Sequence, residues 1–156
     1  ADDIQKEFDL NMRGTWLPSK VMTPLLIGQQ GACVLNVSSM SAFTPLTRIP
    51  GYSGAKAGVS NFTQWLATYL ARSGVRVNAI APGFFMTEQN HALQFNPDGT
   101  PTPRCAHIVD GTPMRRYGEL KELIGAMLFL VDERAASFVT GIVLPVDGGY
   151  SAFSGV

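Results

Sequence analysis

Hydrophobic residues recur at four-residue steps through the opening segment of the chain, DDIQKEFDLNMRGTWLPSKVM. Ile4, Phe8, Met12 and Trp16 occupy successive steps of this pattern. Because residues four apart lie on one face of an α-helix, the spacing predicts an amphipathic helix. Pro18 lacks a backbone N–H and clashes with the preceding turn, so we expect it to end or kink this helix.

Two apolar runs farther along the chain predict buried strands on either side of a long helix. The runs are ACVLNVS (32–38) and VRVNAIAPG (75–83). Short, nearly continuous apolar runs are typical of strands that are covered on both faces. Between them, helical spacing predicts a helix over 52–72 that Ser73-Gly74 stops, with an apolar stripe made of Val59, Phe62, Leu66, Tyr69 and Leu70.

The stretch 84–118 is rich in Pro, Gly, Asn and Thr, with a weak helical pattern near 87–95. A connection this long is usually a lid or a binding element, so we expect a substrate lid here. A third helix is predicted over 119–131 and a third strand within GIVLPVDGG (141–149). Pro145 removes a backbone donor from that strand, which should therefore lie at an edge of the sheet.

This order of elements predicts one α/β domain over 1–156, with about three parallel strands joined by right-handed crossovers and flanked by helices. In such sheets, ligands bind beyond the carboxyl ends of the strands. Ser38-Ser39 follows one predicted strand end, and Pro82-Gly83 follows another. The pattern therefore places two hydroxyls and a Pro-Gly turn on the same rim.

Composition narrows the functional classes. The 156 residues are 46% hydrophobic and 15% charged, with a net charge of zero, which favours a globular domain and disfavours a nucleic-acid partner. No apolar run is long enough for a membrane span, and the acidic start does not resemble a signal peptide. Cys33 and Cys105 have no metal-binding spacing, so we expect no metal site and a reduced, cytoplasmic setting.

The candidate chemistry lies around the start of the long helix. Tyr52 and Lys56 are four residues apart and share a helix face. A free Tyr phenol has a pKa near 10, and a nearby ammonium favours the phenolate. Ser39 ends the preceding strand, thirteen residues before Tyr52, and could hydrogen-bond a carbonyl oxygen. Such a group can hold a ketone and give it a proton while hydride arrives from elsewhere.

Taken alone, the Y-x-x-x-K spacing is weak, since a helical Tyr and Lys are usually core and surface residues. Its context is specific: Ser-Ser at a strand end before it, NAIAPG after it, and FVTGIVLPVDGG near the end of the chain. With these motifs the sequence resembles the C-terminal half or more of a short-chain dehydrogenase/reductase, and the likeness runs through essentially all 156 residues. The resemblance implies the C-terminal part of a Rossmann-like, doubly wound sheet.

The resemblance also implies catalytic roles. Ser39 positions the carbonyl, Tyr52 is the general acid and base, and Lys56 supports Tyr52 and holds the nicotinamide ribose. Asn11, in LNMRGTW, matches the fourth catalytic residue, which helps to hold a proton-relay water. A plain helix-surface Asn is the alternative for that position.

The implied cofactor is NAD or NADP. By resemblance, Pro82, Gly83 and Thr87 line the nicotinamide together with Tyr52 and Lys56, although Thr87 also suits a helix N-cap. The glycine-rich turn that cradles the pyrophosphate in this family is absent from the 156 residues. We therefore expect the chain to begin part-way through the fold, without the adenine half of the nucleotide site.

The predicted lid indicates the substrate. Asn90, His91 and Arg104 lie in it, and Arg48 precedes Tyr52 by one helical turn. These polar and basic side chains suit an anionic, hydroxylated substrate, although solvated loop side chains would look the same. The segments PGFFMTEQNHAL, TPMRRYGE and VDGGYSAFSGV resemble the sugar-acid branch of the family.

Two classes of function follow. The first is an NAD(P)-dependent oxidoreductase that acts on a sugar acid or on another small polar carbonyl compound. The second is a non-catalytic fragment that serves only as a folding or assembly module. Either would have a small-molecule or protein partner rather than a nucleic acid or a membrane. Apolar surface on the two long helices, and the family's helix pairing, lead us to expect a homo-oligomer, a dimer or tetramer.

Overall fold

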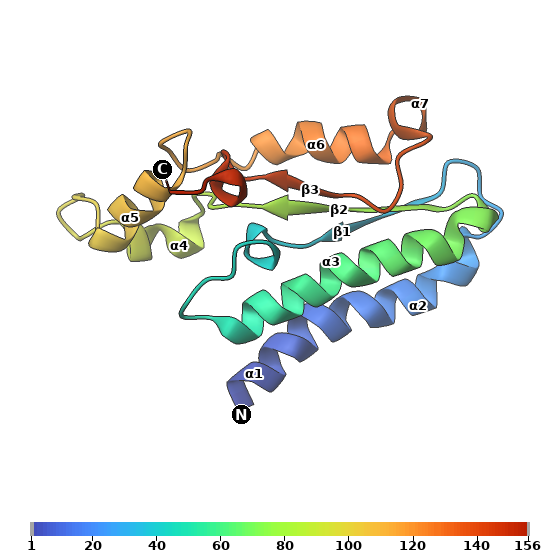
Figure 1. The fold of residues 1–156 in the computed structure, drawn as a ribbon, viewed down its shortest axis with the longest axis horizontal. Coiled ribbons are helices and arrows are strands. Elements are labelled where there is room, and N and C mark those ends of the chain that lie inside the picture. Colours follow the sequence, from blue (N-terminus) through green and yellow to red (C-terminus); the bar gives the residue numbers. More distant parts are fainter. Residues whose placement is uncertain (1, 156) are drawn as a thin grey trace.

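A parallel sheet lies between two layers of helices in the computed structural model, which describes residues 2–155 (Figure 1). Its strands are β1 (Cys33–Val37), β2 (Arg76–Pro82) and β3 (Val143–Val146). They are ordered β1-β2-β3, and both pairings are parallel, as predicted. β2 is buried along almost its whole length, while β1 and β3 form the two edges of the described sheet.

One face of the sheet is covered by α3 and α2, with α1 and η1 packed on α3, and the other face is covered by α6, which α7 follows (Figure 1). Their bounds are α1 (Asp2–Glu7), a π-helix η1 (Phe8–Arg13), α2 (Gly14–Leu26), α3 (Pro50–Leu70), α6 (Glu122–Val131) and α7 (Glu133–Ala136). The α/β fold class is therefore confirmed. Among residues 2–155, no helix is both long and apolar enough to cross a membrane.

The expected end of the helix at Pro18 is wrong, whereas the alternative of a kink there stays a prediction. Helix α2 runs through Pro18 and Pro24 to Leu26. Next to the missing backbone donor of Pro18, a side-chain hydroxyl makes a hydrogen bond within the helix: Ser19 Oγ donates to the Thr15 carbonyl at 2.8 Å. Packing on α3 also holds the helix, since Trp16 meets the ring of Phe62 edge-on at 5.8 Å. Tertiary contacts here override the local cost of proline.

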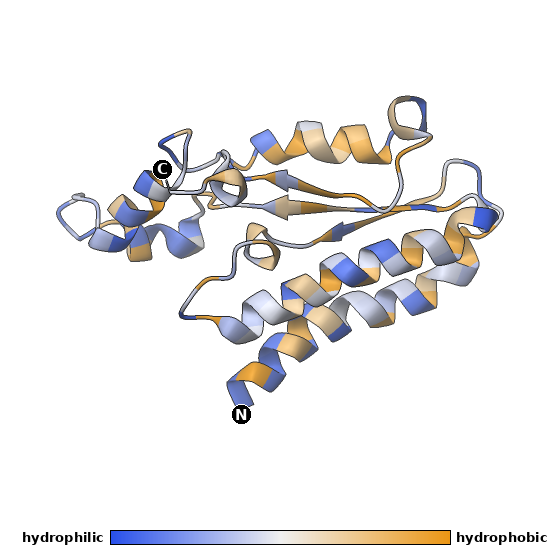
Figure 2. Cartoon of the chain, in the orientation of Figure 1, coloured by the Kyte–Doolittle hydropathy of each residue, from blue (hydrophilic) through white to orange (hydrophobic). Residues whose placement is uncertain are grey.

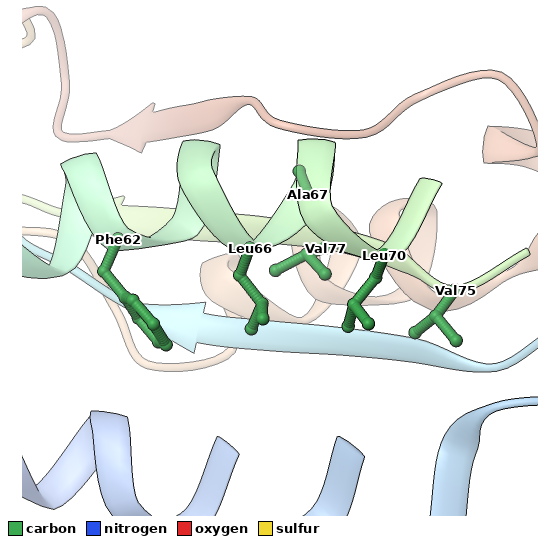
Figure 3. Packing of buried hydrophobic residues seen from close by; sticks show 6 residues of the cluster. All are labelled: Phe62, Leu66, Ala67, Leu70, Val75 and Val77. Atoms are coloured by element: carbon green, nitrogen blue, oxygen red, sulfur yellow. The ribbon is translucent and has the colours of Figure 1, made fainter. Parts of the chain in front are cut away.

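The core lies between α3 and the sheet (Figure 3). Its central cluster combines one side of α3 with the start of β2, and comprises Phe62, Leu66, Ala67, Leu70, Val75 and Val77. Met12, Leu26, Ala32 and Val34 pack against this cluster. The stripe predicted for the long helix is therefore buried except at Tyr69, which is exposed. This packing holds the C-terminal half of α3 against the sheet.

The predicted lid contains two short helices at one end of the molecule (Figure 1). α4 (Glu88–Gln94) confirms the weak helical pattern, whereas α5 (Pro103–Gly111) was not predicted. Its signals are nevertheless ordinary: Thr102 accepts a hydrogen bond from the Cys105 N–H, and Pro103 occupies the first turn. The chain ends in a 3-10 turn, η4 (Tyr150–Ala152), after β3.

Candidate active site

The carboxyl ends of all three strands meet at one rim, next to the lid (Figure 1). At the end of β2, the Gly83 N–H donates to the Val146 carbonyl at 3.0 Å. A Cβ atom at Gly83 would lie 2.6 Å from the Cα of Asp147, which is far inside van der Waals contact. The Pro82-Gly83 turn therefore needs glycine so that β2 and β3 can end side by side.

The two serines after β1, Ser38 and Ser39, are both buried but make different hydrogen bonds. Ser38 Oγ donates to the Lys56 carbonyl at 3.1 Å and lies 2.6 Å from Ser60 Oγ, so it ties the strand to α3. Ser39 Oγ accepts hydrogen bonds from the N–H and the hydroxyl of Ser41, at 3.2 and 3.0 Å. Both contacts use Ser39 as an acceptor, so its own proton remains for another oxygen.

Helix α3 begins at this rim and carries Tyr52 in its first turn. Pro50 stands at the helix start, and Ser53 Oγ accepts a hydrogen bond from the Leu46 N–H at 3.2 Å, which ties the preceding loop to the helix. A Cβ atom at Gly51 would lie 3.4 Å from the Cα of Ile4, so α1 packs closely on this end of α3. The tyrosine is thus mounted on a well-anchored helix start.

Lys56 links α3 to the end of β1. Its Nζ donates to the Val37 carbonyl at 2.9 Å and lies 5.7 Å from the centre of the Tyr52 ring. Burial lowers the pKa of Lys56 below its ordinary value, and the negative charge of Glu7 opposes this by raising it. An ammonium has three protons, so two remain for other partners.

Asn11 lies in the π-helix η1, on the side of α3 that carries Lys56. Its Nδ2 donates to Glu7 Oε2 at 2.8 Å, and its backbone carbonyl accepts a hydrogen bond from Thr15 Oγ1 at 2.8 Å. Asn11 and Lys56 both line a groove of about 550 Å³ between α2 and β1. Short π-helical segments occur frequently at functional sites. The sequence pattern did not predict this one.

Thr87 is the N-cap of α4, which was the alternative role predicted for it. Its hydroxyl accepts from the Asn90 N–H at 3.2 Å, while Asn90 Oδ1 accepts from the Thr87 N–H at 3.0 Å. The Asn90 Nδ2 donates to the Phe85 carbonyl at 2.8 Å. The Asn90 amide is therefore engaged with the lid's own backbone, and its role toward a substrate stays a prediction.

The other predicted substrate residues are exposed and spread around the rim. Arg48 lies in the loop before α3, His91 lies on α4, and Arg104 lies on α5. His91 stacks on Phe95 with ring centres 4.9 Å apart. Within residues 2–155, no hydrogen bond connects these three side chains to Ser39, Tyr52 or Lys56.

Sequence reasoning missed an aromatic cluster at the base of the lid. The Tyr117 hydroxyl donates to Oε1 of the buried Gln94 at 2.6 Å. Phe84 meets the rings of Tyr117 and Tyr150 edge-on, at 6.4 and 5.2 Å. These residues join the two ends of 84–118 to the C-terminal turn. The aromatic residues flanking the segment were the signal that could have indicated this closure.

Comparison with known proteins agrees with this geometry. A family model described as enoyl-(acyl carrier protein) reductase matches residues 1–151. An "Uncharacterized oxidoreductase" from Haemophilus influenzae is 58% identical over 98% of this chain and 54% of its own length. A crystal structure with bound NAD, provisionally named a D-mannonate oxidoreductase from Haemophilus influenza, is 57% identical with a TM-score of 0.94, over 98% of this chain and 55% of that chain.

A gluconate 5-dehydrogenase from Burkholderia cenocepacia, in complex with NADP and tartrate, is 30% identical with a TM-score of 0.82. That match covers 97% of this chain and 57% of the other. The fold and the strand-end site define a Rossmann-like α/β protein. The chain belongs to the short-chain dehydrogenase/reductase family. It spans about half the length of the curated relatives that it matches.

Proposed function

We propose that this chain carries the catalytic group of an NAD(P)-dependent oxidoreductase that interconverts a secondary alcohol and a ketone. The observation that carries this proposal is the placement of Lys56, whose ammonium donates to the Val37 carbonyl at the end of β1, one helical turn from Tyr52. A helix, a strand end and two serines are thereby brought together where ligands bind in parallel sheets.

In the direction of reduction, the Ser39 hydroxyl donates a hydrogen bond to the carbonyl oxygen of the substrate and keeps its proton. The hydroxyl of Tyr52 then transfers its proton to the same oxygen as that oxygen becomes negative. Lys56 carries a positive charge beside the phenol, which stabilises the tyrosinate left behind. Asn11 borders the groove through which a water can return the proton to Lys56.

The cofactor supplies or accepts the hydride. The residues present suit its nicotinamide end, since Lys56 keeps two protons for ribose hydroxyls after bonding Val37. Tyr52, Pro82, Gly83 and Thr87 would complete that part of the site, around the strand ends. NAD is bound to one solved relative and NADP to another, and the two cofactors have the same nicotinamide end.

We propose a sugar acid of the D-mannonate and D-fructuronate type as the substrate. The name of one relative, D-mannonate oxidoreductase, and the tartrate bound to another support an anionic, hydroxylated ligand. Arg48, His91 and Arg104 supply exposed basic groups around the rim. The segment 84–118 serves as the lid over this substrate, with α4 and α5 as its two helices.

We also propose a homo-oligomer and a cytoplasmic setting. Trp65 and Tyr69 stack at 5.1 Å and remain 54% and 64% exposed. Helix α6, which is largely hydrophobic (Figure 2), also has several exposed apolar side chains. Apolar patches of this kind mark association surfaces. Cys33 and Cys105 are both free thiols, which suits a reducing compartment.

The test is hydride transfer in a chain of full family length, made by joining these 156 residues behind the preceding half of the Haemophilus influenzae relative. We expect loss of NADH or NADPH absorbance that depends on D-fructuronate, with slower turnover of uncharged ketoses. The same protein without substrate is the control. Nucleotide binding without turnover of any ketone in the panel would contradict the proposal.

A further inference from the structure

Ser38 has no role in the reaction described above, yet it is more deeply buried than Ser39. It follows β1 directly, and only 2% of its surface is exposed. A hydroxyl at such a position needs hydrogen-bond partners inside the protein. Both partners of Ser38 lie on α3, at the two ends of the helical turn that runs from Lys56 to Ser60.

A hydroxyl has a single proton, which determines the direction of the two Ser38 contacts. Ser38 Oγ donates to the backbone carbonyl of Lys56 at 3.1 Å, so its proton is used there. The 2.6 Å contact between the Ser38 and Ser60 hydroxyls then needs Ser60 as its donor. The contacts form one chain, in which Ser60 donates to Ser38 and Ser38 donates to Lys56. Hydrogen bonds in such a chain strengthen one another.

Lys56 is therefore held at both of its ends. Its carbonyl accepts from Ser38, and its ammonium donates to the carbonyl of Val37, the preceding residue, at 2.9 Å. The lysine side chain is a flexible four-carbon stem, so its contact adapts to the place of the helix. The short Ser38 side chain has no such freedom. The hydrogen bonds within α3 fix the shape of the helix but not its place along β1, and the Ser38 contact sets that place at Lys56.

The same strand and helix are joined a second time, farther from the site. Asn36 Nδ2 donates to Thr63 Oγ1 at 2.9 Å, and both residues are buried. Asn36 and Ser38 are two residues apart and face the same side of the strand. Thr63 lies seven residues after Lys56, which is about two helical turns. This second contact helps to keep α3 on the sheet without touching Lys56, so the two contacts can be compared.

We propose that Ser38 is a positioning residue of this site: its hydroxyl, which accepts from Ser60, sets the place of α3 along β1 at Lys56. Tyr52 lies one turn earlier on the same helix, and Ser39 is the residue directly after Ser38. One contact thus sets the helix groups relative to the strand-end hydroxyl. The catalytic consequence rests on the proposed function, whereas the effect on Lys56 belongs to the chain itself.

The first test measures how firmly Lys56 is held, by NMR relaxation of the lysine methylene groups in the 156-residue chain. The chain contains four lysines, and Lys56→Met identifies the Lys56 signals. Lys56 is half-buried and the other three are exposed, so the unchanged chain should show one rigid lysine and three mobile ones. In Ser38→Ala, we expect the order parameter of Lys56 to fall toward that of the exposed lysines.

Thr63→Val is the matched control, because it keeps the shape of the side chain and removes the other contact between the same strand and helix. Both variants should lower Tm, yet only Ser38→Ala should loosen Lys56. Ser38→Thr retains the hydroxyl and should keep Lys56 rigid. Ser38→Cys, whose thiol is a weak donor, should give an intermediate result even if the Ala variant folds poorly. If Thr63→Val loosens Lys56 as much as Ser38→Ala or Ser38→Cys does, or if neither Ser38 variant loosens it, the proposal is wrong.

The kinetic test is a double-mutant cycle with Lys56→Met in the family-length protein. Ser38→Ala should lower kcat by up to about 10²-fold, the cost of roughly 1 Å of misplacement, and lower it little further once Lys56 is absent. A serine that only stabilised the fold would give equal losses in both backgrounds, and that result would overturn the role of Ser38. An inactive unchanged protein would instead contradict the proposed function, and the relaxation measurement would then decide on Ser38 alone.

Discussion

Neighbouring residues of the same type have different tasks in this site. Ser38 joins β1 to α3 through the Lys56 carbonyl and Ser60, whereas Ser39 only accepts hydrogen bonds from Ser41, and we propose that its own proton faces the substrate. The spacing of Ser39, Tyr52 and Lys56 was readable from the sequence because each side chain follows from its place on a strand end or a helix. The contact between Glu7 and Asn11 also has the ordinary four-residue spacing, but spacing alone does not show whether two polar side chains bond to each other or to water.

At this scale, Tyr52→Phe should lower kcat by about 10²–10⁴-fold, the usual contribution of a general acid. Phe retains the ring and removes only the proton donor, so the circular dichroism spectrum and Tm should stay unchanged. Tyr69→Phe is the matched control, since Tyr69 lies on the same helix and is 64% exposed. Equal kcat in the two variants would remove Tyr52 from the mechanism.

Ser39→Ala should lower kcat by about 10²–10³-fold, the typical cost of losing one donor to a developing oxyanion. The control is Ser41→Ala, which breaks the same 3.0 Å contact between the two hydroxyls but keeps the Ser39 proton. We expect Ser41→Ala to retain most of the activity. If both variants lose activity equally, Ser39 acts through the loop structure rather than on the carbonyl.

At the scale of elements, segments with a clear apolar pattern were predictable. Segments that are mostly exposed, or whose local cost is offset by packing, were not. β2 and α3 follow their apolar patterns because burial decides their conformation, and β1 follows its pattern although only Asn36 in it is buried. The helix end expected at Pro18 is wrong because packing on Phe62 holds the helix together. The predicted helix over 119–131 starts only at Glu122, and α5 was missed because it lies inside a stretch rich in Pro, Gly, Asn and Thr.

The junction between the lid and α6 has a specific ion pair. Arg116 donates to both carboxylate oxygens of Glu122 at 2.7 Å, and Glu122 Oε2 also accepts from the Glu119 N–H at 2.8 Å. The contact with Arg116 lowers the pKa of Glu122 from its ordinary 4.5 to about 2. An acid whose pKa is lower in the folded state than in the unfolded state stabilises the folded state at any pH where the acid is ionised.

The stabilisation from Glu122 should therefore be complete above pH 4.5 and be lost as the pH falls toward 2. The difference in Tm between the unchanged chain and Glu122→Gln should be positive at neutral pH and shrink toward zero in acid. Asp110→Asn is the control, because its pair with Arg115 joins exposed side chains at 3.0 Å without bridging to α6. A Tm difference that does not depend on pH would contradict this account.

At the scale of the whole molecule, the outer face of α3 predicts association. The aromatic ladder of Trp16, Phe62, Trp65 and Tyr69 is exposed at three of its four members. Light scattering should give a dimer or larger species at micromolar concentration. Trp65→Glu should lower the measured mass, and Leu93→Glu, at a 60% exposed position in the lid, should not. A monodisperse monomer would show that this face has another purpose.

The turns that follow the strands determine which part of a dinucleotide the 156 residues can bind by themselves. The pyrophosphate of a dinucleotide usually lies on a helix N-terminus behind a glycine-rich turn, where free backbone N–H groups hold it. In residues 2–155, no turn that follows a strand has the G-x-G-x-x-G pattern. In the proposed function these residues contact only the nicotinamide end of the cofactor, so we expect the 156 residues alone to bind it weakly.

The most direct measurement is a fluorescence or calorimetric titration of the purified 156-residue chain with NADH and NADPH, beside the same chain joined to the preceding half of its Haemophilus influenzae relative. The account predicts no saturable binding at micromolar nucleotide for the chain alone, and binding for the joined protein that weakens in Lys56→Met. Micromolar binding by the chain alone would contradict it, because a phosphate site would then exist among the residues described here.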